Sequence, residues 1–238
     1  FGHHKKYTER TLSYLFSEMI PDSEFKVVNF GEYLSLHPPA YEVKIKEGYN
    51  GEGTSWSCQH GVGRWKENCG CGRSDEYPSQ EWRKPLRESL DWLSDNLILI
   101  FESEGNKYLK DIWIARNEYI DVILNNDKEH IQKFFYSNCN RVLTDEECVI
   151  CIKLLEMQKY AMLMYTSCGW FFSDISGIET LQILQYAARA IEFAKEITGV
   201  SLEDEFIKKI SGAKSNKGEE FNGDVMYKKE VLKKVKSI

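Results

Sequence analysis

A glycine-rich stretch, residues 54–73, contains most of the side chains in this chain that could do chemistry. It reads TSWSCQHGVGRWKENCGCGR and holds three cysteines and a histidine at close spacing: Cys58, His60, Cys69 and Cys71. Thiolate and imidazole groups are the ligands that zinc prefers in tetrahedral sites. The sequence therefore makes these four residues candidate metal ligands.

The spacing of these residues leaves an alternative open. The usual zinc pattern is C-x2-C, whereas this loop contains C-x-H and C-x-C. The cysteines would then be free thiols, and His60 would serve another task. A disulfide between Cys69 and Cys71 is disfavoured if the compartment is reducing.

Two further stretches combine aromatic and polar side chains. Residues 1–4 read FGHH, which places His3 and His4 just before a predicted helix. Residues 166–174 read TSCGWFFSD and include Trp170 and Asp174. Apolar faces with a few placed polar groups are typical of ligand pockets, although a buried helix joint would have the same composition.

The composition limits the class of protein. The 238 residues are 42% hydrophobic and 29% charged, which suits one or two globular domains. A net charge of -6 argues against nucleic-acid binding, and no apolar run is long enough to cross a membrane. Seven cysteines, an odd number, favour the reducing cytoplasm over an oxidising compartment. The chain starts at Phe1, so we expect a piece of a longer protein.

The hydrophobic periodicity predicts a mainly α-helical fold with a few strands. Residues 25–30 (FKVVNF) and 41–46 (YEVKIK) have strand character and follow helical patterns, as in the tail of a (β/α) barrel. Helices are expected over residues 79–101, 111–124, 129–135, 144–165 and 176–198. Thr144 with Glu147, and Ser176 with Glu179, suggest capping boxes, and Gly199 suggests a C-terminal cap.

This pattern predicts four parts. Residues 1–47 would be the last segments of an incomplete barrel, and residues 48–77 a glycine- and cysteine-rich active-site loop. Residues 78–210 would form an antiparallel helical bundle, because short joints favour antiparallel neighbours. Residues 211–238 would be a mobile loop followed by a charged terminal helix.

Three motifs together resemble glycoside hydrolase family 57, in the subgroup whose barrel precedes an uncharacterised helical domain. They are FGHH, TSWSCQHGVGRWKENCGC and LLEMQKYAMLMYTSCGWFFSDISGIETLQILQYAARA. The resemblance covers roughly residues 1–200 and implies the C-terminal part of a retaining enzyme that acts on α-glucans. It also implies that both catalytic carboxylates lie upstream of Phe1, so that no residue of this chain is catalytic.

The resemblance further implies which residues bind the sugar. Tryptophans would stack on sugar rings, and histidine, arginine and aspartate would hydrogen-bond to hydroxyls. The residues expected to bind substrate are His3, His4, Trp56, His60, Arg64, Trp65, Trp170 and Asp174. The expected partners are an α-glucan or oligosaccharide and the N-terminal barrel portion of the same protein, and exposed apolar surface would also permit oligomers.

Two alternatives to this interpretation belong to other classes. The first is a metal-stabilised helical interaction module without catalytic activity. The second is a carbohydrate-binding module without chemistry. No cofactor is required by the glycosidase interpretation, whereas the first alternative requires zinc.

Overall fold

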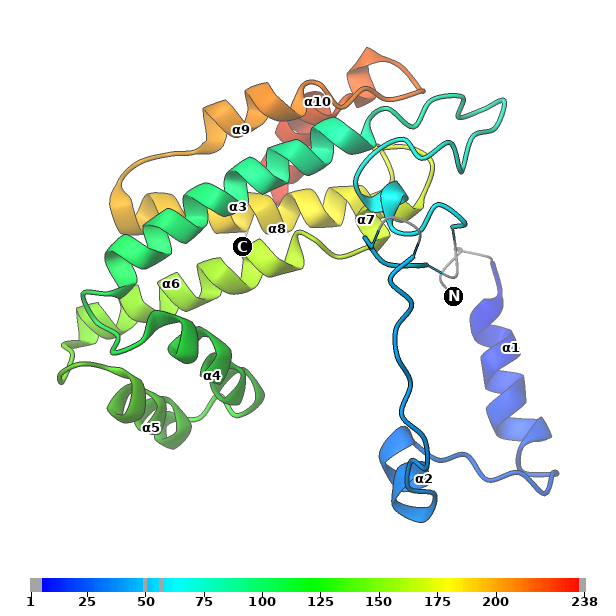
Figure 1. Ribbon diagram of the computed structural model, residues 1–238, viewed down its shortest axis with the longest axis horizontal. Helices are drawn as coiled ribbons and strands as arrows, with labels where there is room; N and C mark the ends of the chain where they lie inside the picture. Colours follow the sequence, from blue (N-terminus) through cyan, green and yellow to red (C-terminus); the bar gives the residue numbers. More distant parts are fainter. Residues whose placement is uncertain (1–5, 49–50, 56–57, 236–238) are drawn as a thin grey trace. The chain divides into compact units, whose positions relative to one another are not determined.

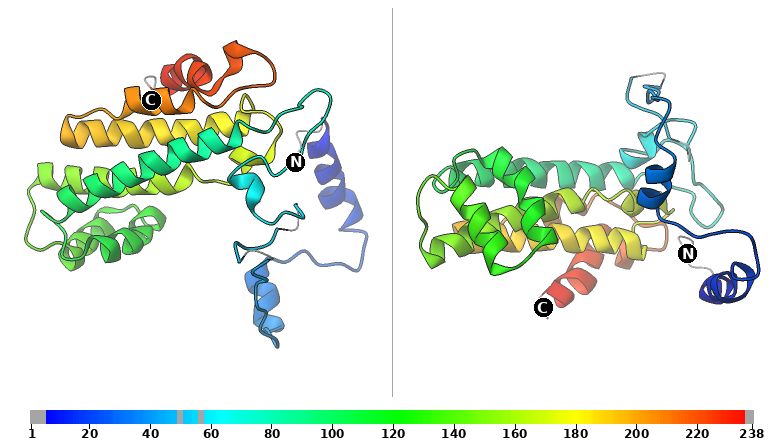
Figure 2. Two further views of the ribbon diagram at one scale, coloured as in Figure 1. Left: turned by 45° about the horizontal axis from the view of Figure 1, so that its top comes forward. Right: turned by 90° about the horizontal axis from the view of Figure 1, so that it is seen from below.

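The computed structural model describes residues 6–48, 51–55 and 58–235. The chain divides into two compact units, residues 1–45 and residues 46–238. Figures 1 and 2 show the second unit as a bundle of helices. None of the described helices has the length and apolar character that crossing a bilayer demands.

The first unit has little core of its own. It contains α1 (Thr8–Tyr14), a π-helical turn η1 (Leu15–Met19) and α2 (Phe30–Leu36). No described residue within it is buried. Its apolar side chains therefore gain little free energy from burial within the unit.

The two strands expected in this unit are absent. Residues 25–29 and 41–46 lie outside helices and strands, and the described residues contain only two isolated β-bridges. Tyr41, Val43 and Ile45 are 91%, 92% and 82% exposed. A strand needs a neighbour to pair its backbone groups, and neither segment finds one here. The prediction of a barrel tail is thus not met by the described residues, although the prediction of a mainly helical chain is confirmed.

Three long helices build the core of the second unit (Figure 1). They are α3 (Arg83–Gly105), α6 (Asp145–Leu163) and α8 (Ile178–Thr198). In α3, buried residues recur every three or four positions, as at Leu86, Leu90, Leu93 and Leu97. α6 runs antiparallel to both α3 and α8, and α9 (Glu203–Ile210) packs along α3.

Shorter helices close the two ends of the bundle. α4 (Ile112–Leu124) and α5 (Lys128–Asn138) form a hairpin near the start of α6. α7 (Cys168–Phe171) fills the joint between α6 and α8 at the opposite end. The short 3-10 turn η2 (Gly63–Trp65) of the glycine-rich loop packs against α7 and α3.

Local signals in the sequence set several helix ends. Thr144 and Glu147 form the expected capping box, and Gly199 ends α8 with a φ of 76°. The second expected box, Ser176 with Glu179, is wrong because Gly177 precedes α8 and makes no side-chain cap. Ser176 instead donates its backbone amide to Asp174.

The C-terminal segment packs against the second unit with one of its faces. It forms α10 (Gly223–Met226), a π-helical turn η4 (Tyr227–Val231) and α11 (Leu232–Val235). Ala213, Tyr227 and Val231 are fully buried in the core of the second unit. The lysines at positions 228 and 229 occupy only the outward face of this segment, which is why its charge suggested a solvated helix.

Candidate metal centre

The four candidate ligands of the glycine-rich loop converge on one point. Cys58, His60, Cys69 and Cys71 place their ligand atoms within 4.8 Å of one another. The Cys58 sulfur lies 3.8 Å from that of Cys69 and 3.7 Å from that of Cys71. His60 Nδ1 lies 3.8 Å from the Cys58 sulfur and 3.3 Å from the Cys71 sulfur.

The four pairwise distances of 3.3–3.8 Å are close to the edges of a zinc tetrahedron. With Zn–S bonds of about 2.3 Å, a regular tetrahedron has S–S edges of about 3.8 Å, and its S–N edges are about 3.6 Å. The sulfurs are too far apart for a disulfide, whose S–S bond is about 2 Å, and all seven cysteines are free. The cluster can therefore hold a metal such as zinc.

Left-handed glycines shape the backbone around the ligands. Gly61, Gly70 and Gly72 have φ values of 69°, 87° and 80°, in the region that side chains disfavour. A Cβ on Gly61 would lie 2.6 Å from the carbonyl oxygen of Gly53. The loop can therefore fold back tightly after His60 only because residue 61 is glycine.

The surroundings shift the pKa values of two of these thiols in opposite directions. Burial opposes ionisation of Cys69, but hydrogen bonds from the Cys71 amide and the Cys58 thiol outweigh it and lower the pKa of Cys69. Burial and the neighbouring Cys58 and Cys69 thiols raise the pKa of Cys71 to about 11. Several thiolates at this spacing repel one another, and a divalent cation removes that repulsion.

Two buried arginines stand beside the thiols. Arg64 and Arg83 are 8% and 0% exposed. A Cβ added to Gly72 would lie 3.5 Å from Nη2 of Arg64 and 3.6 Å from Nη2 of Arg83, so both guanidinium groups approach the residue that follows Cys71. Burial lowers the pKa of Arg83 to about 10, the charge of Arg64 lowers it too, and the three thiols oppose both effects.

Hydrogen bonds fasten the loop to the end of the bundle. Trp65 Nε1 donates to the carbonyl of Ser167 at 3.0 Å, and Arg64 Nη2 donates to that of Phe171 at 3.3 Å. Gln80 Nε2 bridges the carbonyls of Gly72 and Ser173 at 3.2 and 3.0 Å. The ligand loop and the joint at α7 are thus one hydrogen-bonded structure.

Two of the residues predicted to bind sugar, Trp170 and Asp174, are buried and contact other parts of the second unit. Trp170 is 1% exposed and stacks on Tyr165, so its ring has no free face for a sugar. Asp174 is 5% exposed and accepts hydrogen bonds from Ser176, Ser215 and Asn216. Both side chains are thus buried and held by internal contacts, and their predicted role in sugar binding stays a prediction.

The remaining predicted residues divide in three ways. Arg64 is buried beside the thiols, and Trp65 packs partly buried against the core. His60 directs Nδ1 to the sulfurs and so belongs with the metal ligands. His3, His4 and Trp56 lie outside the described residues.

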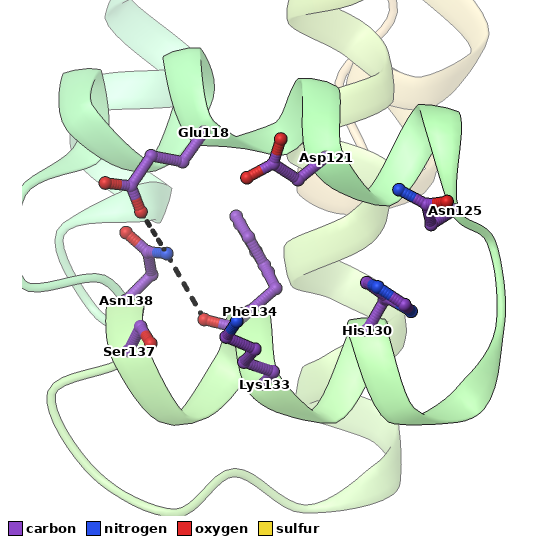
Figure 3. Close-up of a pocket in the computed structure, with 8 residues that line it drawn as sticks. All are labelled: Glu118, Asp121, Asn125, His130, Lys133, Phe134, Ser137 and Asn138. Carbon is purple, nitrogen blue, oxygen red and sulfur yellow. Dashed lines mark hydrogen bonds between the residues drawn. The ribbon is translucent and has the colours of Figure 1, made fainter.

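Apart from the cysteine cluster, a hollow of about 400 Å³ lies between α4 and α5 (Figure 3). Glu118 and Asp121 lie across it from Lys133 and His130. Asn138, the buried amide at its edge, donates to Glu118 at 2.9 Å and to the Phe134 carbonyl at 3.2 Å. These hydrogen bonds join residues of the α4–α5 hairpin to one another and do not indicate which ligand, if any, the hollow would bind.

Sequence reasoning missed Arg83 and Gln80, which complete the centre from the start of the bundle. A pattern search within residues 54–73 cannot find them, because they come from the next segment of the chain. The available signal was an arginine in an otherwise apolar helical face, at the end of α3 that meets the loop.

Comparison with known families identifies the helical part of the chain. A family model described as "Domain of unknown function (DUF3536)" matches residues 79–238, the greater part of the chain, and the chain belongs to this family. The four ligands precede the matched region, so the case for a metal depends on the geometry described above. No curated protein and no solved structure matches the chain.

Proposed function

We propose that Cys58, His60, Cys69 and Cys71 bind one structural zinc ion, and that this ion holds the glycine-rich loop against the end of the helical bundle. The observation that carries this proposal is the convergence of four ligand atoms within 4.8 Å. The chain is then a zinc-stabilised helical module.

A structural role fits the donor set better than a catalytic one. Catalytic zinc keeps a position open for water or substrate, whereas four protein ligands close the coordination sphere. Nδ1 of His60 faces the sulfurs, which leaves Nε2 to carry the proton of the neutral ring. Zinc would replace thiol protons by a cation and supply folding free energy to a segment with few apolar contacts.

Elemental analysis of the purified chain tests the proposal. We expect one zinc per chain, lost in Cys69→Ser together with part of the thermal stability. Cys168→Ser is the matched control, because Cys168 is exposed on α7 and is not one of the four ligands. A zinc content of zero in the reduced wild-type chain would contradict the proposal.

We also propose that this module belongs to an α-glucan-acting glycosidase or glucanotransferase and docks on its barrel portion. The resemblance to glycoside hydrolase family 57 supports this, and so does the exposed alternation of residues 41–45. Tyr41, Val43 and Ile45 extend from one edge of that segment with no partner strand among the described residues. A sheet edge in a barrel portion would pair with such a segment.

Turnover of maltooligosaccharides tests this second proposal. We expect none from the chain alone and activity from the protein that joins it to a barrel portion. Turnover by the chain alone, lost in Trp56→Ala, would contradict the non-catalytic assignment. An inactive joined protein would contradict the glucan assignment and leave the zinc proposal standing.

A further inference from the structure

Arg83 is a buried cation whose charge lacks an obvious partner. It is the first residue of α3 and is 0% exposed. Its Nη2 donates to the carbonyl of Phe172 at 3.5 Å, while Nε and Nη1 have no hydrogen-bond partner in the part of the chain that the structure describes. A guanidinium stays protonated in proteins, so burial costs the full desolvation of a charge.

Among the described residues, Arg83 makes no ion pair with an aspartate or glutamate. The charge of Arg64 repels that of Arg83, whereas Cys58, Cys69 and Cys71 attract it when they are ionised. Two buried cations side by side require nearby negative charge to be stable.

The metal centre supplies that negative charge when it is occupied. Zinc with three thiolates and a neutral imidazole has a net charge of about -1, the sum of +2 and -3. With protonated thiols and no metal, the centre carries no charge that could offset that of Arg83. The sign of the effect of Arg83 on stability thus depends on whether the metal is bound.

We propose that Arg83 is the buried counter-ion of the metal–thiolate centre and couples metal binding to the start of the helical bundle. This proposal rests on the zinc site proposed above. Arg83 acts through the thiolates, as a positioning residue for the loop, and does not itself ligate the metal. Its place at the first turn of α3 links the loop to the longest helix of the unit.

Thermal unfolding of the full chain, with zinc and after chelation, tests this coupling. Arg83→Met keeps the length of the side chain and removes its charge. We expect it to lower the melting temperature of the zinc-bound chain and to raise that of the metal-free chain. Zinc affinity, measured by competition with a chromogenic chelator, should fall about 10- to 100-fold, as for other residues that support metal ligands.

Two variants serve as controls. Arg83→Lys keeps the charge and should retain most of the zinc affinity. Lys84→Met removes a charge from the next residue, which is exposed. It should change the melting temperatures of the zinc-bound and metal-free chains equally and only slightly.

The outcomes separate the two proposals. If Arg83→Met destabilises the zinc-bound and metal-free chains equally, or leaves zinc affinity unchanged, Arg83 only packs and the counter-ion proposal is overturned. If the wild-type chain binds no zinc, the zinc proposal fails and the counter-ion proposal fails with it. Failure of Arg83→Met to fold with zinc, while Arg83→Lys folds and binds zinc, would support the charge requirement.

Discussion

The carboxylate of Asp174 accepts two hydrogen bonds from Asn216, one from its backbone nitrogen at 2.8 Å and one from its side-chain amide at 3.0 Å. The same amide donates to the carbonyl of Ser79 at 2.9 Å, and its oxygen accepts the Ser79 backbone amide at 2.9 Å. The pair therefore joins three segments: the chain before α3, the joint before α8, and the loop before α10. This contact attaches residues 215 and 216 to the bundle, within a stretch whose composition suggests a mobile loop.

Replacing Asp174 with Asn should destabilise the second unit by about 1–3 kcal/mol, because a buried carboxylate that accepts several hydrogen bonds loses its charge and an acceptor. Chemical denaturation at neutral pH measures this change. Asp75→Asn, at an exposed loop position, is the control and should have little effect. Equal stability of Asp174→Asn and the wild type would contradict the role given to Asp174.

The same contact predicts a pH dependence. Burial alone would raise the pKa of Asp174, but hydrogen bonds from Ser176 and Asn216 outweigh it and lower that pKa below the usual value of 3.8. A carboxyl whose folded pKa is depressed contributes stability above its unfolded pKa of about 3.9 and loses it as pH falls through the folded pKa. The gap in stability between the wild type and Asp174→Asn should therefore be full at pH 6 and shrink below about pH 4. A gap that stays constant down to the acid transition would contradict this.

Gly61→Ala should weaken metal binding more than Gly70→Ala does. Both glycines have positive φ, so alanine strains the backbone at each by about 1–2 kcal/mol. Only at Gly61 would the new Cβ also meet a backbone atom, the Gly53 oxygen at 2.6 Å, whereas nothing lies within 4 Å at Gly70. Competition with a chelator measures the zinc affinity of both variants. Equal losses of affinity in the two would mean that the turn after His60 does not shape the site.

Gly169→Ala should destabilise the packing of α7 on α8 by about 1–3 kcal/mol, as overpacking of a core does. The added Cβ would lie 2.9 Å from Cγ1 and 3.0 Å from Cγ2 of Ile183. Ile183→Val removes one methyl group from this contact, so the double variant should lose less stability than the sum of the single ones. Additive losses in denaturant unfolding would show that the two residues are not in close contact.

Trp170→Ala should act on stability and not on sugar binding. The side chain is buried against Tyr165 and the core, so its removal should cost about 3–5 kcal/mol. Titration with maltooligosaccharide, followed by tryptophan fluorescence, should give the same response for the wild type and for the less disruptive Trp170→Phe. A response that depends on Trp170 would restore it as a residue that faces the sugar.

Local chemistry in the sequence predicted the helices well. Apolar spacing located α3, α4, α6 and α8 to within a few residues, because their buried faces repeat with the helical period. Thr144 and Gly199 marked helix ends since each satisfies backbone groups locally. The strands were wrong for the opposite reason: residues 41–46 have the right alternation, but pairing depends on a neighbour that the described residues do not provide.

The candidate site was only partly predictable. The sequence pointed to the four candidate ligands, although their C-x-H and C-x-C spacing departs from the usual C-x2-C. Left-handed backbone at Gly61, which follows His60, and at Gly70, which lies between Cys69 and Cys71, accompanies this unusual spacing. Burial of Trp170 and the internal partners of Asp174 could not be read from residue types, which are the same in a ligand pocket and in a helix joint.

X-ray absorption at the zinc edge of the purified chain tests the central claim most directly, because it reports the atoms bound to the metal. The account predicts three sulfurs at about 2.3 Å and one nitrogen at about 2.0–2.1 Å, and Cys69→Ser should lose a sulfur or the metal altogether. A chain that binds no zinc when reduced, or zinc surrounded only by oxygen and nitrogen, would contradict it.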